Sequence, residues 1–416
     1  MQRRRRRRCR KEGLLGRLRV TTAGESHGPG EVCILEGIPA GLELEASAID
    51  RDLARRQTGY GRGERQKIEL DRCRFAAGVR RGRTMGTPIC IIVENRDHAN
   101  WRQSMAPEKE VEVGDIPSPL TVPRPGHADL VGLAKHGLND IRDVLERASA
   151  RETVARVAGG SVCRALLAEL GVSIRGRVTR IGSVAIHTDI GWASPDSVDW
   201  DAVEASPVGC DDPVAGAAMC EAVDRARTDG DSLGGVFEVW CWGVCPGLGG
   251  YATVDQRLDG RLVGALGSIP AVKGVEIGPA FENATLPGSR VHDPLTLQMN
   301  GKTTWIGRET NRAGGLEGGC STGMPIVLSA AMKPIPTLTK ALPSVDVVTL
   351  EPTDAHVERS DVTAVPSARV VGEAMVAQIV AAAYVEKFGG DSLGSLKAAV
   401  LSYEADLEER GLWRCS

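Results

Sequence analysis

The chain has 416 residues, of which 42% are apolar and 4% aromatic, and its formal net charge is −3. This length and apolar fraction predict a globular protein with a sizeable buried core. The low aromatic content disfavours a surface that stacks single-stranded nucleic acid, and no apolar run reaches the roughly 20 residues that span a membrane.

The charge is unevenly distributed along the chain. Residues 1–12 contain eight Lys and Arg against one acid, so the rest of the chain carries −10. We interpret 1–12 as a disordered arginine-rich arm, or as the product of an upstream start codon; a nucleic-acid-binding tail is the weaker alternative, because a lone charge run is usually solvated. Residues 51–83 carry eleven Lys and Arg against four acids, which in an acidic protein favours a small anionic ligand.

The eleven cysteines are scattered, and no two form a C-x-x-C pair; Cys241 and Cys245 are the closest. This usage favours reduced thiols in a cytoplasmic protein over a zinc site or a disulfide framework. We therefore expect no metal site.

The first half of the chain contains several helix signals. A capping-box-like start at Ser47 predicts a helix to about Gln57, followed by a glycine-rich cationic loop over 57–66. The pattern over 67–97 predicts strands joined by a glycine turn, and 104–126 is proline-rich and irregular. A helix ending at Gly137 and a short second helix over 140–149 follow.

The strongest helix prediction covers 149–171, with Ser149 as N-cap, Glu152 closing a capping box and Gly171 ending the helix. Further helices are predicted from Asp212, over 254–267, and from Val370 to a stop at Gly389.

The pentapeptide GDSLG occurs at 230–234 and again at 390–394, each time just after a predicted helix. An internal pseudo-repeat of two similar halves would explain this, and chance is the alternative. Strands and helices do not alternate regularly, and neither G-x-G-x-x-G nor a P-loop is present. We therefore predict an α+β fold with antiparallel sheets rather than a doubly wound parallel sheet.

Two arginine-bearing segments could bind anions. In RASARE (147–152), Arg147 and Arg151 flank the free N–H groups of a helix start capped by Ser149. In 57–65, glycines allow close backbone approach while Arg62 and Arg65 reach a ligand, with Arg56 just before them. The alternatives are a solvated helix start and an exposed loop.

Two histidines lie in small-residue segments, His27 in TTAGESHG and His127 in PRPGHADL. Each could be a proton donor, although a structural role is the commoner one for an isolated histidine. Lys333 precedes a stiff Pro-x-Pro, and Arg359 and Asp361 share one face of an extended segment. Together these features predict a pocket for a small, multiply anionic ligand.

Nine segments, in this order, resemble the chorismate synthase family over about Gly13 to Gly394: TAGESHG, TGYGRGERQKIE, PRPGHAD, VLERASARET, GDSLGG, AVKGVEIG, NRAGGLEGG, AAMKPIPT and RSDVTAVP. The resemblance implies conversion of 5-enolpyruvylshikimate 3-phosphate to chorismate and phosphate by an anti-1,4-elimination that requires reduced FMN. It also implies two antiparallel β-sheets around a helical layer, and a homotetramer.

The resemblance assigns catalytic roles to three residues. His27 is similar to a general acid beside the substrate phosphate, and His127 to the residue that handles a proton on the reduced flavin. Asp361 resembles the acid that assists hydrogen removal near flavin N5.

The resemblance also implies binding residues. For the substrate they are Arg56, Arg65, Arg124, Ser149, Arg151 and Arg359. For FMN they are Arg147, Ala148, Ser149, Ala271, Gly318, Lys333, Pro334, Ile335, Pro336, Thr337 and Arg359. Arg56 and Arg62 are also positions that the family links to NADP(H), a possible source of reductant.

Three features depart from the family pattern: Pro270 where Asn or Gln is common, Thr363 where Cys is usual, and the arginine arm. We expect a single catalytic domain over 13–400, a C-terminal tail over 401–416, and a separate flavin reductase. The rival hypotheses are a basic-armed nucleic-acid-binding protein and an NADPH-linked reductase on the same scaffold.

Overall fold

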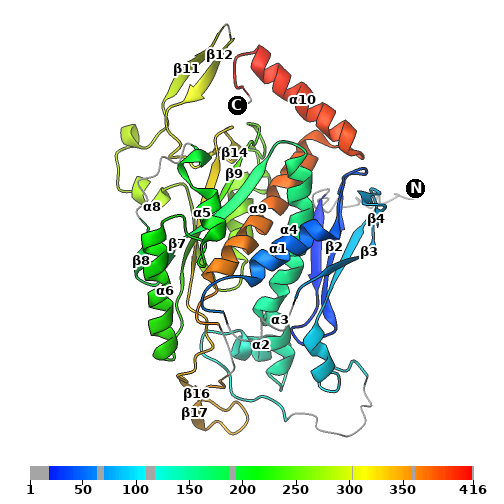
Figure 1. Cartoon of the computed structure of the whole chain (residues 1–416), viewed down its shortest axis with the longest axis vertical. Helices are drawn as coiled ribbons and strands as arrows, with labels where there is room; N and C mark the ends of the chain where they lie inside the picture. Colours follow the sequence, from blue (N-terminus) through cyan, green and yellow to red (C-terminus); the bar gives the residue numbers. More distant parts are fainter. Residues whose placement is uncertain are drawn as a thin grey trace, which may run out of the picture.

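The computed structural model describes residues 18–62, 70–108, 118–186, 194–301, 303–357 and 361–414. The predicted arm over 1–12, Arg65 and Arg359 lie outside the described residues. Two antiparallel sheets enclose a layer of helices (Figure 1), which confirms the predicted α+β class.

The first sheet has the strand order β1-β2-β6-β3, and every neighbouring pair is antiparallel. Its strands are β1 (Arg19–Ala23), β2 (Gly30–Glu36), β3 (Cys73–Ala77) and β6 (Ile89–Glu94). Side chains alternate between the two faces, so Cys33 and Leu35 of β2 are buried while Ile34 between them is exposed. One face of this sheet therefore covers the helical layer.

The second sheet has the order β10-β15-β9-β7-β8 and is also antiparallel throughout. Its strands are β7 (Ser173–Ile181), β8 (Val184–Ala185), β9 (Gly235–Trp242), β10 (Val272–Ile277) and β15 (Ile326–Met332). The far side of β9 and β15 is covered by a separate small cluster, in which Trp240 and Val327 pack with Val203 of α5 (Trp200–Ala205).

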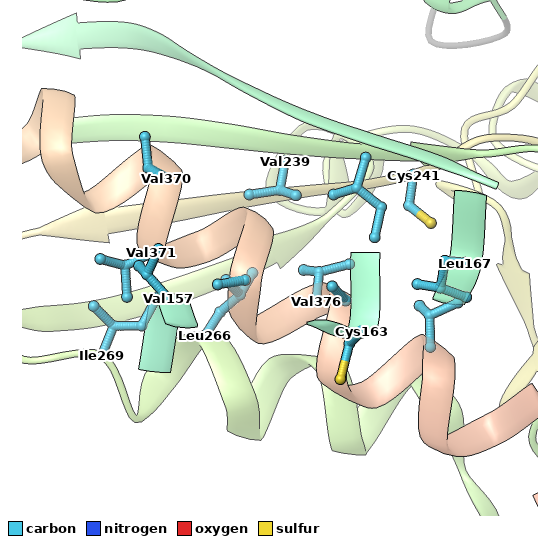
Figure 2. Packing of buried hydrophobic residues seen from close by; sticks show 14 of the residues in the cluster. Val157, Cys163, Leu167, Val239, Cys241, Leu266, Ile269, Val370, Val371 and Val376 are labelled. Atoms are coloured by element: carbon cyan, nitrogen blue, oxygen red, sulfur yellow. The ribbon is translucent and has the colours of Figure 1, made fainter. Parts of the chain in front are cut away.

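The helical layer consists mainly of α4 (Thr153–Ala168), on the side of the first sheet, and α9 (Val365–Phe388), on the side of the second. The two helices approach closely at Gly160, where an added Cβ would lie 2.3 Å from the Cβ of Ala374. Figure 2 shows side chains of both helices packed together with Val239 of β9. By length and composition α9 could cross a membrane, but 83% of its apolar stretch is buried inside the protein, as expected of a core helix.

The remaining helices and short strands surround this core. They are α1 (Ala46–Gln57), α2 (Asp129–His136), α3 (Arg142–Ala148), α6 (Pro213–Thr228), α7 (Leu258–Gly267), α8 (Ala280–Asn283), α10 (Leu393–Glu409), β4 (Val79–Arg80), β5 (Arg83–Thr84), β11 (Leu295–Asn300), β12 (Thr303–Arg308), β13 (Leu316–Glu317), β14 (Cys320–Ser321), β16 (Pro343–Val345) and β17 (Pro352–Asp354). Helices α2 and α3 lie below the end of α4 (Figure 1) and share a small hydrophobic cluster of their own.

Several predicted helix ends are confirmed. Asp212 caps α6 by accepting hydrogen bonds from the N–H groups of residues 214 and 215. Gly137 ends α2 in the left-handed region at φ 67°, and Gly389 follows the last residue of α9. The two GDSLG segments each follow a helix, as expected; the first leads into β9 and the second into α10.

Other helix boundaries were predicted wrongly. The N-cap of α1 is Glu45 rather than Ser47. Ser149 caps a 3₁₀ turn over 150–152 instead of α4, and Glu152 accepts from Arg156 Nε at 2.9 Å rather than closing a capping box. Helix α9 begins five residues earlier than predicted, because Pro366 fits the first turn of a helix. The predicted tail boundary at 401 falls within α10.

Candidate active site

A cavity of about 590 Å³ opens where the N-terminal ends of α4 and α9 meet the C-terminal end of α1. The N-terminal ends of α4 and α9 line it, and the positive end of a helix dipole favours an anion nearby. Thirteen of the predicted site residues line this cavity: His27, Arg56, Arg62, Arg124, His127, Ala148, Ser149, Ala271, Lys333, Ile335, Pro336, Thr337 and Asp361.

Two arginines at this site share one buried carboxylate. Arg56 Nη2 lies 3.0 Å from Asp71 Oδ2, and Arg151 Nη1 lies 2.6 Å from Asp71 Oδ1. Arg56 also donates to Thr153 Oγ1 at 3.3 Å, and Arg151 donates through Nε to Asn95 Oδ1 at 2.8 Å. Arg151 is therefore one step behind the cavity wall and fixes the position of Arg56 through Asp71.

Burial disfavours the charged form of the cavity arginines. It lowers the pKa of the Arg56 guanidinium, which the charge of Asp71 opposes. It lowers the pKa of Arg62 to about 10, which the charge of Asp361 opposes; the two side chains lie 3.2 Å apart. A bound anion would add negative charge beside these cations and so would oppose the effect of burial on their pKa values.

His27 is held at the cavity wall by α3. Its Nδ1 lies 2.8 Å from Glu146 Oε1, and its ring packs against Trp101 at a tilt, with ring centroids 4.0 Å apart. Ser26 Oγ lies 3.2 Å from Ser149 Oγ beside it. His27 itself lines the cavity.

His127 is paired in the same way. Its Nδ1 contacts Asp129, a fully buried carboxylate that also accepts from Arg124 Nε at 2.9 Å. Burial alone would raise the pKa of Asp129, but the hydrogen bonds from His127 and Arg124 outweigh burial and lower it. Asp129 is thus an ionised acceptor, and Arg124 reaches on to Thr337 Oγ1 at 3.2 Å.

Lys273 and Lys333 also line the cavity. Lys333 Nζ donates to the carbonyl of Gly126 at 2.9 Å, and the Lys333 N–H donates to the carbonyl of Ala271. Ala271 is in the left-handed region at φ 68°, which is uncommon for a non-glycine residue. Burial, and then the neighbouring charge of Lys273, lower the pKa of Lys333.

Some predicted residues do not line the cavity. Arg147 turns away from it and donates to Thr22 Oγ1 at 2.8 Å, and Gly318 forms the turn between β13 and β14. Pro334 is also absent from the wall. Arg65 and Arg359 fall outside the described residues.

Three carboxylates at the site were missed from sequence: Asp71, Asp129 and Glu146. Asp129 lies two residues from His127, so a histidine followed by a nearby acid was a usable signal for that pair, whereas Glu146 is 119 residues from His27. Asp71 is 15 and 80 residues from its two arginines, and nothing local marks it. Among the described residues, no cluster of His, Cys, Asp and Glu could hold a metal ion.

Arginines, lysines and two histidine–carboxylate pairs around one cavity are the groups that an enzyme needs to bind a small, multiply anionic substrate and to transfer protons. The family model for chorismate synthase matches residues 18–385. The chain belongs to the chorismate synthase family, which confirms the resemblance, and it is an enzyme of the lyase class.

Individual relatives agree with this assignment. The chain is 57% identical over 383 residues to the chorismate synthase of Desulforudis audaxviator, covering 91% of this chain and 95% of that protein. It is 52% identical over 396 residues to the chorismate synthase of Rubrobacter xylanophilus, covering 95% and 98%. A crystal structure of chorismate synthase superposes with a TM-score of 0.75 at 38% identity, covering 94% of this chain and 98% of the other.

Proposed function

We propose that this chain converts 5-enolpyruvylshikimate 3-phosphate to chorismate and phosphate by anti-1,4-elimination, and that it requires reduced FMN. The observation that carries the proposal is the gathering of family-matched arginines and histidines from distant segments around one cavity. This reaction is the last common step toward the aromatic amino acids.

The charges of the cavity suit the substrate. The substrate carries one phosphate and two carboxylates, and planar guanidinium groups bind both kinds of group in bidentate fashion. Arg56, Arg62 and Arg124 line the cavity together with residues of the first turns of α4 and α9. We propose that these arginines, together with Arg65, Ser149, Arg151 and Arg359, bind and orient the substrate.

The lining also suits FMN. The volume of the cavity is within the range of cofactor sites. Apolar side chains in the lining provide a surface for a flat ring system; they are Ile269, Met332, Ile335 and Val371. Lys333 and Thr337, with Ala148, Ser149 and Ala271, would hold the cofactor, and the remaining positions proposed for it are Arg147, Gly318, Pro334, Pro336 and Arg359. When bound, reduced flavin supplies transient electron donation that helps phosphate leave. Pro270 lines the same wall and offers no side-chain hydrogen bond.

Three residues move protons in this proposal. His27 donates a proton to the departing phosphate, and His127 holds a proton at the flavin. Asp361, four residues before α9 begins and 3.2 Å from Arg62, would assist removal of hydrogen from the substrate near flavin N5. Each lines the cavity, so each could reach a ligand bound there.

The assembly and the supply of reductant are also proposals. We propose a cytoplasmic homotetramer whose reduced FMN comes from a separate flavin reductase. NADP(H) is a possible reductant, with Arg56 and Arg62 as its binding positions.

The test is anaerobic incubation of the protein with the substrate and dithionite-reduced FMN. Phosphate release that depends on reduced FMN, without net consumption of NADPH, is the expected result. Stoichiometric NADPH oxidation in the presence of prereduced FMN would favour the alternative of an NADPH-linked reductase. No phosphate release under these conditions would contradict the proposed elimination.

A further inference from the structure

Glu146 contacts the segment that carries His27 at three points. Its backbone carbonyl accepts from the Ser26 N–H at 2.9 Å, and its Oε2 accepts from the His27 N–H at 2.8 Å. Its Oε1 lies 2.8 Å from His27 Nδ1. One residue of α3 therefore fixes the backbone and the imidazole of His27 together.

The carboxylate of Glu146 is ionised in this arrangement. Burial would raise the pKa of Glu146, but its hydrogen bonds with His27 and the charge of Arg142 outweigh burial and lower it. Arg142 Nη1 lies 3.4 Å from Glu146 Oε1. An ionised carboxylate can only accept hydrogen bonds, so the hydrogen between the two side chains belongs to His27 Nδ1.

The rest of the His27 ring is also constrained. Trp101 packs against the His27 ring. The Arg142 guanidinium, which also contacts Glu146, lies 4.9 Å from the centroid of the Trp101 ring. Among the described residues none hydrogen-bonds Nε2 of His27, and the residue lines the cavity. Nε2 is thus the ring nitrogen that remains for a ligand.

We infer that Glu146 is a positioning residue that holds His27 in the form protonated on Nδ1, so that proton transfer in the reaction takes place at Nε2. Proton transfer at Nε2 rests on the proposed function, whereas the position of the proton on Nδ1 does not. In the donating form, the imidazolium gives its Nε2 proton to the phosphate oxygen. The neutral ring that remains keeps the proton on Nδ1, where it is hydrogen-bonded to the Glu146 carboxylate. Glu146 itself gains and loses no proton in this step.

The geometry makes Glu146→Gln an informative variant. Glu146 accepts from the His27 backbone N–H with one oxygen and from Nδ1–H with the other. A glutamine has one acceptor oxygen, and the fixed backbone N–H would take it. The amide NH₂ would then face Nδ1 as a donor, which favours the neutral ring protonated on Nε2 and opposes the imidazolium.

The first experiment reads the histidine tautomer directly, by nitrogen NMR of protein labelled with ¹⁵N-histidine. The chain has seven histidines, so a spectrum of the His27→Asn variant identifies the signals of His27. At a pH where the ring is neutral, we expect the proton of wild-type His27 on Nδ1. A proton on Nε2 in the wild type would overturn the inference, whether or not any variant folds, and this reading does not depend on activity.

The second experiment compares variants of α3. We expect Glu146→Gln to move the neutral-ring proton to Nε2 and to lower kcat by roughly 10²–10³, the lower part of the range of general-acid contributions, with a smaller change in KM. Asp143→Asn removes an exposed carboxylate from the same helix and is the matched control. If the folded Glu146→Gln variant has the same His27 tautomer and the same turnover as the wild type, the inference is also overturned. If the wild type shows the Nδ1 tautomer but has no activity, only the proposed function is refuted.

Discussion

Asp71 provides the negative charge between two arginines of the site, and Asp71→Asn removes that charge while preserving the size of the side chain. The carboxylate is fully buried, and the side chains of Arg56 and Arg151 are only 7% and 10% exposed. The asparagine amide can accept from one guanidinium through its oxygen, but its NH₂ group would face the other as a donor. Two buried cations would then share a site from which their common counter-charge has been removed.

The expected loss of stability follows from this burial. Removing one partner of a buried ion pair costs about 3–5 kcal/mol, because the other charge stays uncompensated. Thr153 still accepts from Arg56 and Asn95 still accepts from Arg151, so we expect the lower end of that range, about 3 kcal/mol. The control is Glu43→Gln, whose partner Arg83 is 61% exposed; an exposed pair contributes about 0–1 kcal/mol.

The assay is urea denaturation followed by far-ultraviolet circular dichroism, with and without inorganic phosphate as a probe anion. We expect phosphate to raise the free energy of unfolding of Asp71→Asn more than that of the wild type, because it replaces part of the missing charge. A loss no larger than that of Glu43→Gln would refute the reasoning, since Asp71 would then not be what holds the two arginines.

Three further predictions follow from residues at or near the site. Burial raises the pKa of Glu31 to about 7, so the native protein retains a proton that the unfolded chain releases above pH ~4.5, and stability falls as pH rises through this window. Glu31→Gln lacks this contribution and should match the wild type below pH ~4.5 but exceed its unfolding free energy by about 3 kcal/mol at pH 8, as measured by urea denaturation; an equal pH dependence would contradict the shift. Gly126→Ala places a Cβ at φ 81°, 3.4 Å from Lys333 Nζ, and should cost about 1–2 kcal/mol in thermal denaturation; no loss would mean that the turn relaxes. His27→Ala and His127→Ala should each lower the rate of phosphate release by roughly 10²–10⁴, and near-normal turnover in either would remove that residue from the mechanism.

The elements that were predicted correctly are those whose signals are local. Asp212 with Pro213, Gly137 and Gly389 mark helix ends through their own backbone conformation and capping, so four or five residues suffice to recognise them. The prediction from Ser149 was wrong because its side chain caps a 3₁₀ turn that precedes α4, and not α4 itself. A capped 3₁₀ turn and a capped α-helix begin with the same local sequence pattern.

The candidate site was predictable only in part. Most of its basic residues and both histidines were found, because their segments resemble the family. The acids that position them were not, since Glu146 is 119 residues from His27 and Asp71 is 80 residues from Arg151. Such pairs of side chains form only in the folded protein, where the two sheets enclose α4 and α9. The periodicity of the sequence therefore does not predict them.

The small separate cluster beneath α2 and α3 has a consequence for how the enzyme loses activity. Leu133, Ile141 and Leu145 form it apart from the main core, so this pair of helices can open locally at a lower cost than the central layer. Asp129 and Glu146 lie on these helices, and one such opening would release both histidines at once. We therefore expect amide hydrogens of α2 and α3 to exchange faster than those of α4 and α9, and inactivation in urea to precede global unfolding.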